Sequence, residues 1–518
     1  MQLSIDDAFG TIGHLVRQHA RQAPGRIALH DASDATRITY QELDRRMDRV
    51  AAALQAEGLA VGDRIAICGK ASIGYAVVFL GALRAGVVVA PLAPSSSPET
   101  LSRMLSDAGA RLFFIDDSVK ALADAVPDGS LPLERIALDD GGTGQSFSAW
   151  LGRTDATPAP ADIGPASAFN IIYSSGTTGE PKGIVQSHGM RWAHVQRGRF
   201  SGYGAGSVTV LSTPLYSNTT LVLFFPTLAF GGTVALLHKF SVPAYLSTCE
   251  QLRATHTMLV PVQYQRLMAS ELFDRHDLSS FVNKFSTSAP FAASLKADVL
   301  KRWPGGLIEY YGMTEGGGTC ILEAHNHPDK LHTVGQPASG SDIRLIDDEG
   351  REVGQGETGE VVGHSAGMMT GYFGQPEKTR DAEWFDPQGK RFIRTGDVGR
   401  FDEDGFLVLM DRKKDMIISG GFNIYPSDIE DVLHRHSAVL EAAVVALPSE
   451  AWGESPGGFV VLREGHRDTP AETLRDWVNE RVGKTQRLVS LQLMDELPRS
   501  AIGKVLKREL RDAAVRRP

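Results

Sequence analysis

The amino-acid sequence predicts an α/β fold with a large N-terminal domain of α/β sheets, a β-rich subdomain and a small α+β domain at the C-terminus. The first observation is an alternation of helical stretches with short β-branched runs, which is typical of parallel α/β sheets. The second is a shift after Gly335 to short strands separated by glycine-rich turns. The third is the length of 518 residues, which exceeds what one compact domain usually holds.

The expected elements follow from hydrophobic period and from turn residues. In the N-terminal part they are a helix over 40–56, a strand over 64–68, a helix over 71–85, and strands over 87–90, 169–173 and 233–237. The β-rich part is predicted to contain strands over 342–346, 359–362 and 406–410. The last unit, from about Lys414, is predicted to contain a strand over 416–418, a helix over 427–435, strands over 439–446 and 491–494, and a helix from near Val505.

Composition and charge exclude several classes of protein. A net charge of -9 gives no general attraction to nucleic acid or to anionic lipid, so anionic ligands must be bound by local groups. Three widely spaced cysteines form no disulfide framework or CxxC motif, which fits a reducing cytoplasm. Residues 1–10 lack the features of a secretory signal. The uncharged segment 200–237 is interrupted by Pro226 and Gly231-Gly232, so a buried helix, a turn and a strand are predicted there and no transmembrane segment.

Glycines, hydroxyl side chains and a lysine are concentrated in residues 173–183, Tyr-Ser-Ser-Gly-Thr-Thr-Gly-Glu-Pro-Lys-Gly. The glycines let the backbone approach an anion, the hydroxyl groups can bond phosphate oxygens, and the lysine adds a positive charge. The segment therefore predicts a loop that binds a polyphosphate. Its candidate ligands are Ser174, Ser175, Gly176, Thr177, Thr178, Gly179 and Lys182.

Two alternative interpretations of this loop are disfavoured. A P-loop NTPase would need glycine where Pro181 stands and a magnesium-binding Ser or Thr where Gly183 stands. A Ser/Gly-rich surface linker is the second alternative. Strand-like residues on both sides, 169–173 and Ile184-Val185, indicate instead that the loop lies between two strands.

Together with four further motifs, this loop resembles the adenylate-forming superfamily, which includes acyl-CoA and aryl-CoA synthetases, firefly-type luciferases and peptide-synthetase adenylation domains. The other motifs follow in family order: Tyr311-Gly312-Met313-Thr314-Glu315, Thr395-Gly396-Asp397, the hinge segment Asp411-Arg412-Lys413-Lys414-Asp415 with Gly420-Gly421, and Pro498-Arg499-Ser500-Ala501-Ile502-Gly503-Lys504. The resemblance spans essentially the whole chain and points most closely to acid:CoA ligases. It implies an N-terminal adenylation domain, 1–413, and a mobile C-terminal domain, 414–518.

The resemblance also implies roles in the first reaction step, in which a carboxylic acid and ATP form an acyl-AMP. Glu315 is implied as the Mg2+ ligand, Thr314 as a donor to the α-phosphate and Tyr311 as a stacking partner of adenine. Asp397 is implied to accept both ribose hydroxyls, and Arg412 to donate to the same sugar or to a nearby phosphate. A lone exposed glutamate or a Thr-Gly-Asp turn would not by itself indicate a functional role. The roles are assigned because these residues lie within motifs that follow one another in the family order.

For the transition state of that step, the resemblance implies that the ammonium of Lys504 bridges the attacking carboxylate and the α-phosphate, which offsets repulsion between two anions. In the second step the resemblance implies that the C-terminal domain rotates about Lys414. The rotation removes Lys504 from the active site and brings the surface that carries Gly420 and Gly421 to it. Glycines suit that surface because the pantetheine arm of coenzyme A must pass close to the backbone. A simple β-turn would also favour a glycine pair.

The acid-binding segment lacks the aspartate with which amino-acid-selecting adenylation domains usually pair an α-ammonium group. Residues 214–220 are Pro-Leu-Tyr-Ser-Asn-Thr-Thr, without a carboxylate, and the aromatic or histidine gate of many CoA ligases is absent at about Ser217. Small residues at 288–290 and 316–318 suggest an apolar pocket for an aromatic acid or a medium-chain fatty acid. The candidate acid-binding residues are Tyr216, Ser217, Asn218, Ala289, Gly316 and Gly317.

Two other motif matches are rejected. Gly363-His364-Ser365-Ala366-Gly367 fits a hydrolase nucleophile elbow, but the glycines that follow are a poor start for the helix that such an elbow needs. Glu323, His325, His327 and His332 could suggest a metal site, but a polar loop is the better interpretation.

The leading prediction is a cytoplasmic, ATP-dependent carboxylic acid:CoA ligase, an AMP-forming acid–thiol ligase that uses ATP, Mg2+ and coenzyme A. Its partners are then a small-molecule carboxylic acid, ATP and CoA, with no nucleic acid and with a homodimer left open. Three alternatives remain: an acyl-AMP ligase that loads a carrier protein, a luciferase-like oxidation, and a non-catalytic binding protein of the same fold. Retention of Lys504, Glu315 and Asp397 opposes the last, because a decayed site would lose such charged groups.

Overall fold

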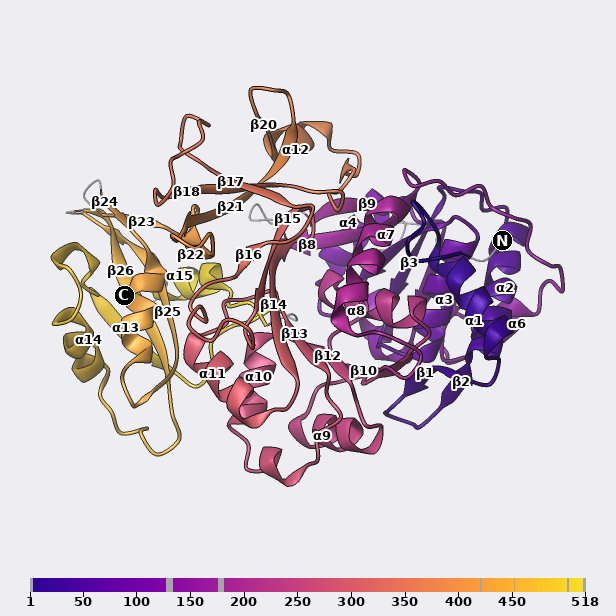
Figure 1. Ribbon diagram of the computed structural model, residues 1–518, viewed down its shortest axis with the longest axis horizontal. Coiled ribbons are helices and arrows are strands. Elements are labelled where there is room, and N and C mark those ends of the chain that lie inside the picture. Colours follow the sequence, from indigo (N-terminus) through magenta and orange to yellow (C-terminus); the bar gives the residue numbers. More distant parts are fainter. Residues whose placement is uncertain are drawn as a thin grey trace. The chain divides into compact units, whose positions relative to one another are not determined.

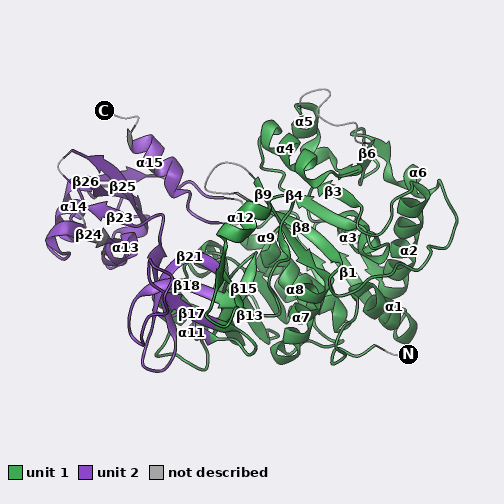
Figure 2. Ribbon diagram, turned by 90° about the horizontal axis from the view of Figure 1, so that it is seen from above, with its two compact units in different colours: residues 1–331, 337–342, 363–393 green, residues 332–336, 343–362, 394–518 purple. Residues whose placement is uncertain are grey.

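The computed structural model describes residues 3–126, 134–175, 181–419, 422–450, 452–500 and 503–515. The chain divides into two compact units, which Figure 2 shows in different colours. The first comprises 1–331, 337–342 and 363–393, and the second comprises 332–336, 343–362 and 394–518. The predicted domain boundary between 413 and 414 remains a prediction.

One mixed sheet of the first unit contains strands from the N-terminus and from the segment between 208 and 337 (Figure 1). Its central strands, β14 to β1 in the order below, are parallel, while β15 and β2 are antiparallel to their neighbours. In spatial order the described strands are β16 (Gln336–Pro337), β15 (Gly316–Glu323), β14 (Gly306–Met313), β13 (Asn283–Ser286), β12 (His256–Leu259), β10 (Val208–Leu211), β11 (Thr233–Leu236), β1 (Ile27–Asp31) and β2 (Arg37–Thr39).

A second mixed sheet of the same unit carries the predicted phosphate-binding segment at one side. Its strands from β8 to β7 are parallel, and β9 and β19 continue it in antiparallel pairing. In spatial order the described strands are β19 (Gly371–Tyr372), β9 (Pro181–Ser187), β8 (Ala168–Ser175), β4 (Val88–Leu92), β3 (Arg64–Cys68), β5 (Leu112–Ile115), β6 (Glu134–Ala137) and β7 (Gln145–Ser146).

Helices of the first unit begin repeatedly at a Ser or Thr whose hydroxyl accepts a hydrogen bond from the first turn, as Thr39, Ser72, Ser187 and Ser217 do. The described α-helices are α1 (Ile12–Gln22), α2 (Tyr40–Ala56), α3 (Ile73–Arg84), α4 (Pro98–Ala108), α5 (Lys120–Asp124), α6 (Phe147–Leu151), α7 (His188–Arg197), α8 (Asn218–Ala229), α9 (Val242–Gln251), α10 (Pro261–Met268), α11 (Ala293–Arg302) and α12 (Pro376–Asp381). Single 3-10 turns lie at Asp117–Val119, Gly198–Ser201 and Phe273–Arg275.

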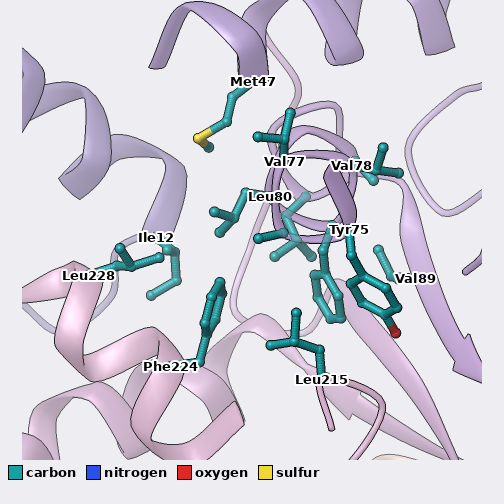
Figure 3. Packing of buried hydrophobic residues seen from close by; sticks show 14 of the residues in the cluster. Ile12, Met47, Tyr75, Val77, Val78, Leu80, Val89, Leu215, Phe224 and Leu228 are labelled. Carbon is teal, nitrogen blue, oxygen red and sulfur yellow. The ribbon is translucent and has the colours of Figure 1, made fainter. Parts of the chain in front are cut away.

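The main core of the first unit forms around α3 and α8, which are apolar on nearly all sides. Figure 3 shows Leu80 of α3 and Phe224 of α8 in one cluster with Met47 of α2. α3 contacts β3 and β4 of one sheet and β1 of the other, so it joins the two sheets. A helix with apolar residues on every face must be buried, and this burial holds the two sheets of the unit together.

The second unit contains two further groups of strands. β17 (Asp342–Ile346), β18 (Gly359–His364), β21 (Arg391–Phe401) and β22 (Leu407–Arg412) pair in that order, and the first residues of β21 pair within the first unit with β20 (Glu383–Phe385). The other group is β24 (Phe422–Ile424), β23 (Ile417–Ser419), β26 (Gly453–Leu462), β25 (Val439–Ser449) and β27 (Ser490–Met494). It packs with α13 (Pro426–His434), α14 (Ala471–Asn479), α15 (Lys507–Val515) and the 3-10 turn Lys484–Gln486.

Most predicted elements are confirmed, including α2 with the predicted bounds. The helix, the turn and the strand predicted for 200–237 are confirmed as α8, residues 230–232 and β11, but Pro226 is not an interruption, because α8 continues through it to Ala229. The hydroxyl of Thr227 donates to the carbonyl of Leu223 on the same turn, and the helix ends before Gly231, which has φ +80°. No helix in the described ranges combines the length and the apolar character that a bilayer crossing requires. The rejected nucleophile elbow is also not formed, since a turn follows β18 where that motif needs a helix.

Candidate active site

The predicted phosphate-binding segment lies between two antiparallel strands, as expected. Ser174 and Ser175 end β8, and Lys182 is the second residue of β9, where Ser174 pairs with Lys182. Gly176, Thr177, Thr178 and Gly179 lie outside the described residues. Tyr173, at the start of the segment, donates from its hydroxyl to Asp107 Oδ2 over 2.7 Å, so α4 anchors the end of β8.

Three separate segments meet at the side chain of Tyr372. The Nζ atom of Lys182 lies 5.1 Å from the centre of the Tyr372 ring, and the Tyr372 hydroxyl donates to Glu315 Oε1 over 2.9 Å. β19 pairs with β9 in the register Tyr372 to Ile184, which positions the ring. Burial and the adjacent Glu315 carboxylate raise the pKa of Tyr372, so its hydroxyl stays protonated and donates at neutral pH.

The carboxylate of Glu315 is buried, and no Lys, Arg or His lies within ion-pair distance of it among the described residues. Its main chain is also held, because the Met369 N–H donates to the Glu315 carbonyl over 2.7 Å. A buried carboxylate without a basic partner is costly unless a cation neutralises it. This single buried carboxylate is the type of ligand that a hard divalent cation such as Mg2+ prefers.

Thr314 is connected to the phosphate-loop strand through its backbone. The side chain of Gln186 on β9 donates from Nε2 to the Thr314 carbonyl over 2.8 Å. Gln186 is itself buried and accepts hydrogen bonds from Asn170 and Arg191. The Thr-Glu pair at the β14–β15 turn is thus attached to β9 on two sides, through Gln186 and through Tyr372.

Tyr311, Gly316 and Gly317 lie on the two strands of the same hairpin. Tyr311 pairs with Cys320, and its side chain is half-buried. Gly316 has φ +80° and Gly317 has φ +77°, and a Cβ atom at Gly316 would lie 1.9 Å from the Gly367 carbonyl oxygen. Glycine is therefore required at Gly316 by close backbone packing.

The candidate acid-binding residues of α8 lie beside the loop after β13. Thr219 and Ser288 share a hydrogen bond of 2.6 Å between their hydroxyls, which brings Asn218 near Ala289 in space. Ser217 caps α8, and Asn218 Oδ1 is buried with no hydrogen-bond partner in the described chain. Ser288 has φ +82°, a conformation that non-glycine residues rarely adopt and that often marks a functional loop.

Tyr216 precedes these residues and is largely enclosed. Burial raises the pKa of its hydroxyl to about 12, and the side chain of Ser95 bonds to it. The phenol is therefore neutral at physiological pH and can act as a donor or acceptor.

The predicted ribose-binding residues meet in the second unit. Asp397 of β21 pairs with Arg412 of β22, and their side chains form an ion pair with 3.1 Å between Arg412 Nε and Asp397 Oδ1. The Thr395 hydroxyl accepts from the Asp397 N–H over 3.0 Å and donates to the Val361 carbonyl. The Thr-Gly-Asp tripeptide thus orients its aspartate through the threonine, with Gly396 at φ +71°.

The predicted hinge lies in the turn after β22. The N–H groups of Asp415 and Met416 both donate to the Arg412 carbonyl, and Lys413 pairs with Asp348 at 2.6 Å. Lys414 is exposed. The protein atoms around its ammonium group partly desolvate it and lower its pKa. Gly420 and Gly421 lie outside the described residues.

Lys504 occupies a tight loop ahead of α15. The Ser500 N–H donates to the Lys504 carbonyl over 2.8 Å, and Gly503 has φ +77°. Arg499 braces this loop by donating to the Gly503 carbonyl and by pairing with Glu441. The side chain of Lys504 is exposed.

Sequence reasoning missed Tyr372 and Gln186 as supports of the motif residues. Tyr372 could have been found, because Gly371-Tyr372 already resembles a family segment. Gln186 has no such signal, since its hydrogen bond to the Thr314 carbonyl joins two segments that are distant in the chain.

Comparison with known proteins identifies the family. A family model described as "AMP-binding enzyme" matches residues 16–373, and one described as "AMP-binding enzyme C-terminal domain" matches 428–504. A feruloyl-CoA synthase of an Amycolatopsis species is 33% identical over 95% of this chain and 97% of its own length. A fatty acid–[acyl-carrier-protein] ligase of Streptomyces coeruleorubidus is 31% identical over 95% of this chain and 94% of its own length.

Solved structures agree with these matches. The amide bond synthetase McbA of Marinactinospora thermotolerans has a TM-score of 0.85 and is 28% identical over 97% of this chain and 99% of its own. ATP-bound MatB of Rhodopseudomonas palustris has a TM-score of 0.86 at 28% identity, covering 97% of this chain and 99% of its own. The predicted fold class and the predicted AMP-forming acid–thiol ligase are confirmed at the level of the family: the chain belongs to the AMP-binding, adenylate-forming enzymes, among relatives that are acyl-CoA and aryl-CoA ligases.

Proposed function

We propose that the protein is an ATP-dependent carboxylic acid:CoA ligase that acts on an aromatic acid or a medium-chain fatty acid. In the first step a carboxylate oxygen attacks the α-phosphorus of ATP, and pyrophosphate leaves. In the second step the thiolate of coenzyme A attacks the acyl carbon, and AMP leaves. The convergence of Lys182, Tyr372 and Glu315 is the observation that carries the proposal, because it joins a phosphate-loop lysine to a buried carboxylate that needs a cation.

We assign roles to the residues of the first unit on this basis. Lys182 and the hydroxyl groups of 174–178 would bind the β- and γ-phosphates, and Thr314 would donate to the α-phosphate. Glu315 would hold Mg2+, which when bound neutralises charge on the triphosphate. Tyr372 keeps the carboxylate of Glu315 oriented toward that position.

For the second unit we propose that Asp397 and Arg412 bind the ribose of the nucleotide. The ion pair between them supports this assignment, because it orients the aspartate. We propose Lys504 as the cation that stabilises the first transition state, and Lys414 as the hinge.

The acid-binding residues are proposed to be Tyr216, Ser217, Asn218, Ala289, Gly316 and Gly317. The hydrogen bond between Thr219 and Ser288 supports this grouping, since it links the start of α8 to the loop that carries Ala289. The absence of a carboxylate in 214–220 supports an acid without an α-ammonium group.

A carrier-protein thiol is the second candidate acceptor, supported by the relative that is named a fatty acid–[acyl-carrier-protein] ligase. The test is pyrophosphate release with a panel of carboxylic acids, followed by thioester formation with CoA or with a phosphopantetheinylated carrier protein. Thioester formation with CoA supports the leading proposal, and thioester formation with the carrier protein alone replaces it. Failure of every acid to release pyrophosphate would refute both.

A further inference from the structure

Helix α7 presents basic side chains to the interior of the first unit. Arg191, His194 and Arg197 follow one another at spacings of three residues, so they lie along one side of the helix. α7 contacts α8, as Figure 1 also shows, and α8 carries the proposed acid-binding residues at its start. The basic side chains therefore lie on a helix that packs against the helix carrying the proposed acid-binding residues.

His194 lies next to the motif hairpin through one intervening glycine. A Cβ atom at Gly316 would touch the backbone of Gly367, and a Cβ atom at Gly367 would lie 3.4 Å from His194 Nε2. The Nδ1 atom of His194 is buried and has no hydrogen-bond partner within the described residues. A buried ring nitrogen without a partner is costly, so this position calls for a polar group that the chain does not itself supply.

Arg197 continues the same face toward Tyr310. Its Nη1 atom donates to Thr319 Oγ1 over 3.3 Å, and it interacts electrostatically with Tyr310. The Tyr310 ring stacks on Phe285 with 5.6 Å between the ring centres, which fixes the direction of the hydroxyl. Throughout the described chain, no carboxylate lies within ion-pair distance of Arg191 or Arg197.

His194, Arg197 and Tyr310 are each half-buried, whereas the neighbouring Phe285 is fully buried.

Burial and the nearby Arg191 and Arg197 hold the pKa of His194 well below its usual range, so the imidazole is neutral at physiological pH. A neutral imidazole still offers one N–H and Arg197 offers several, and the Tyr310 hydroxyl, which also bonds to the side chain of Ser201, lies beside them. The constellation is rich in donors and poor in acceptors.

We propose that His194, Arg197 and Tyr310 form the specificity-determining end of the acid pocket and select a carboxylic acid that carries a hydrogen-bond-accepting oxygen at its far end. This inference rests on the proposed function and narrows it: a purely apolar tail would leave the buried Nδ1 atom of His194 unpaired. A hydroxyl and a second carboxylate share the required chemistry. A site built to bond an oxygen rejects the analogue that lacks it far more strongly than an apolar pocket rejects an added group.

The experiment compares acids that differ only at the far end, by specificity constant for pyrophosphate release. The series is 4-methylcinnamate, 4-hydroxycinnamate and 4-carboxycinnamate, with octanoate and 8-hydroxyoctanoate as an alkyl pair. For the wild-type protein we expect the oxygen-bearing acids to be favoured at least about tenfold over the methyl acid of the same skeleton. The comparison of 4-carboxycinnamate with 4-hydroxycinnamate shows whether the site prefers an anionic or a neutral oxygen group at the far end of the acid.

The variant His194→Phe is expected to reduce that preference to within about twofold, and His194→Gln, which keeps an N–H donor, to restore most of it. The matched control is His188→Phe, the same change at a buried histidine of α7 that packs on Phe169 and should leave the preference as it is. Because the specificity constants for the two acids are measured with the same preparation of a variant, their ratio does not depend on the fraction of the protein that is folded. A wild-type ratio near one, or an unchanged ratio in His194→Phe, overturns the inference, whereas absence of pyrophosphate release with every acid overturns the proposed function as well.

Discussion

The hydroxyl of Tyr372 donates a hydrogen bond to the carboxylate of Glu315, with 2.9 Å between the oxygens. The two residues are far apart in the sequence, and β19 and the β14–β15 turn bring them together. The same tyrosine ring lies beside Lys182, so one aromatic side chain supports both the proposed metal ligand and the phosphate-loop lysine. The predictions below test this arrangement and the proposed roles around it.

The first prediction compares the loss of the Glu315 carboxylate with the loss of the Tyr372 hydroxyl that donates to it. Glu315→Gln should lower the specificity constant for pyrophosphate release by about a hundredfold, because a neutral amide binds a hard cation poorly. Tyr372→Phe should lower it by about tenfold, since it removes one hydrogen bond to a charged group and keeps the ring next to Lys182. Both should also raise the Mg2+ concentration that gives half-maximal rate. Tyr245→Phe, which removes a buried tyrosine hydroxyl that donates to Thr257, is the control; an equal loss there would assign the effect to folding.

The second prediction concerns Lys504. Lys504→Ala should abolish acyl-AMP formation and leave the conversion of supplied acyl-AMP and CoA to thioester largely intact, because the ammonium is proposed to act only in the first transition state. The two half-reactions are measured separately by pyrophosphate exchange and by thioester formation. Lys484→Ala, a change at a lysine of a 3-10 turn in the same unit, should affect neither. Equal losses in both half-reactions would refute the assignment.

The third prediction concerns the hinge. Lys414→Pro should slow thioester formation much more than acyl-AMP formation, because only the second step is proposed to require rotation about this residue. Among the residues of this turn, the N–H groups of Lys413, Asp415 and Met416 make backbone hydrogen bonds, so proline at 414 spares those bonds. A bulky change at the glycine pair, such as Gly421→Leu, should have the same effect. Unchanged rates of thioester formation in both variants would refute the proposed rotation about Lys414 between the two steps.

The fourth prediction tests whether glycine is needed at Gly316 for backbone packing or for binding of the acid. Gly316→Ala should lower the free energy of unfolding by at least about 2 kcal/mol, because the new methyl group meets the Gly367 carbonyl and alanine is strained at positive φ. Chemical denaturation measures the change. Gly142→Ala, at a glycine with nothing within 4 Å of its added Cβ, should be nearly neutral. Full stability in Gly316→Ala together with altered acid selectivity would show that the acid pocket, and not backbone packing, requires glycine at this position.

The fifth prediction concerns discrimination against amino acids. The enzyme should favour 3-phenylpropionate over phenylalanine by at least about a hundredfold in specificity constant, because an α-ammonium would be buried among Ser217, Asn218 and Gly316 without a carboxylate partner. Pyrophosphate release with each acid measures this ratio. Comparable rates would mean that a carboxylate lines the site, and an amino-acid-activating function would then lead.

The sequence by itself determined the fold class, the order of most elements and the family. The bounds of α2 and the strands on both sides of the phosphate loop follow from local patterns: hydroxyl caps, hydrophobic period and glycine turns act over a few residues. The motif residues could be named for the same reason, since each motif is a short contiguous segment.

Only the tertiary structure decided which of these residues support one another. The hydrogen bonds from Tyr372 to Glu315 and from Gln186 to Thr314 join segments that are distant in the chain. The same limit applies to His194, which is one histidine among 15 in the sequence. Its unpartnered nitrogen and its neighbour Gly367 become evident only when α7 packs against the segment after β18, because burial and the lack of a partner are properties of the folded chain and not of its local sequence.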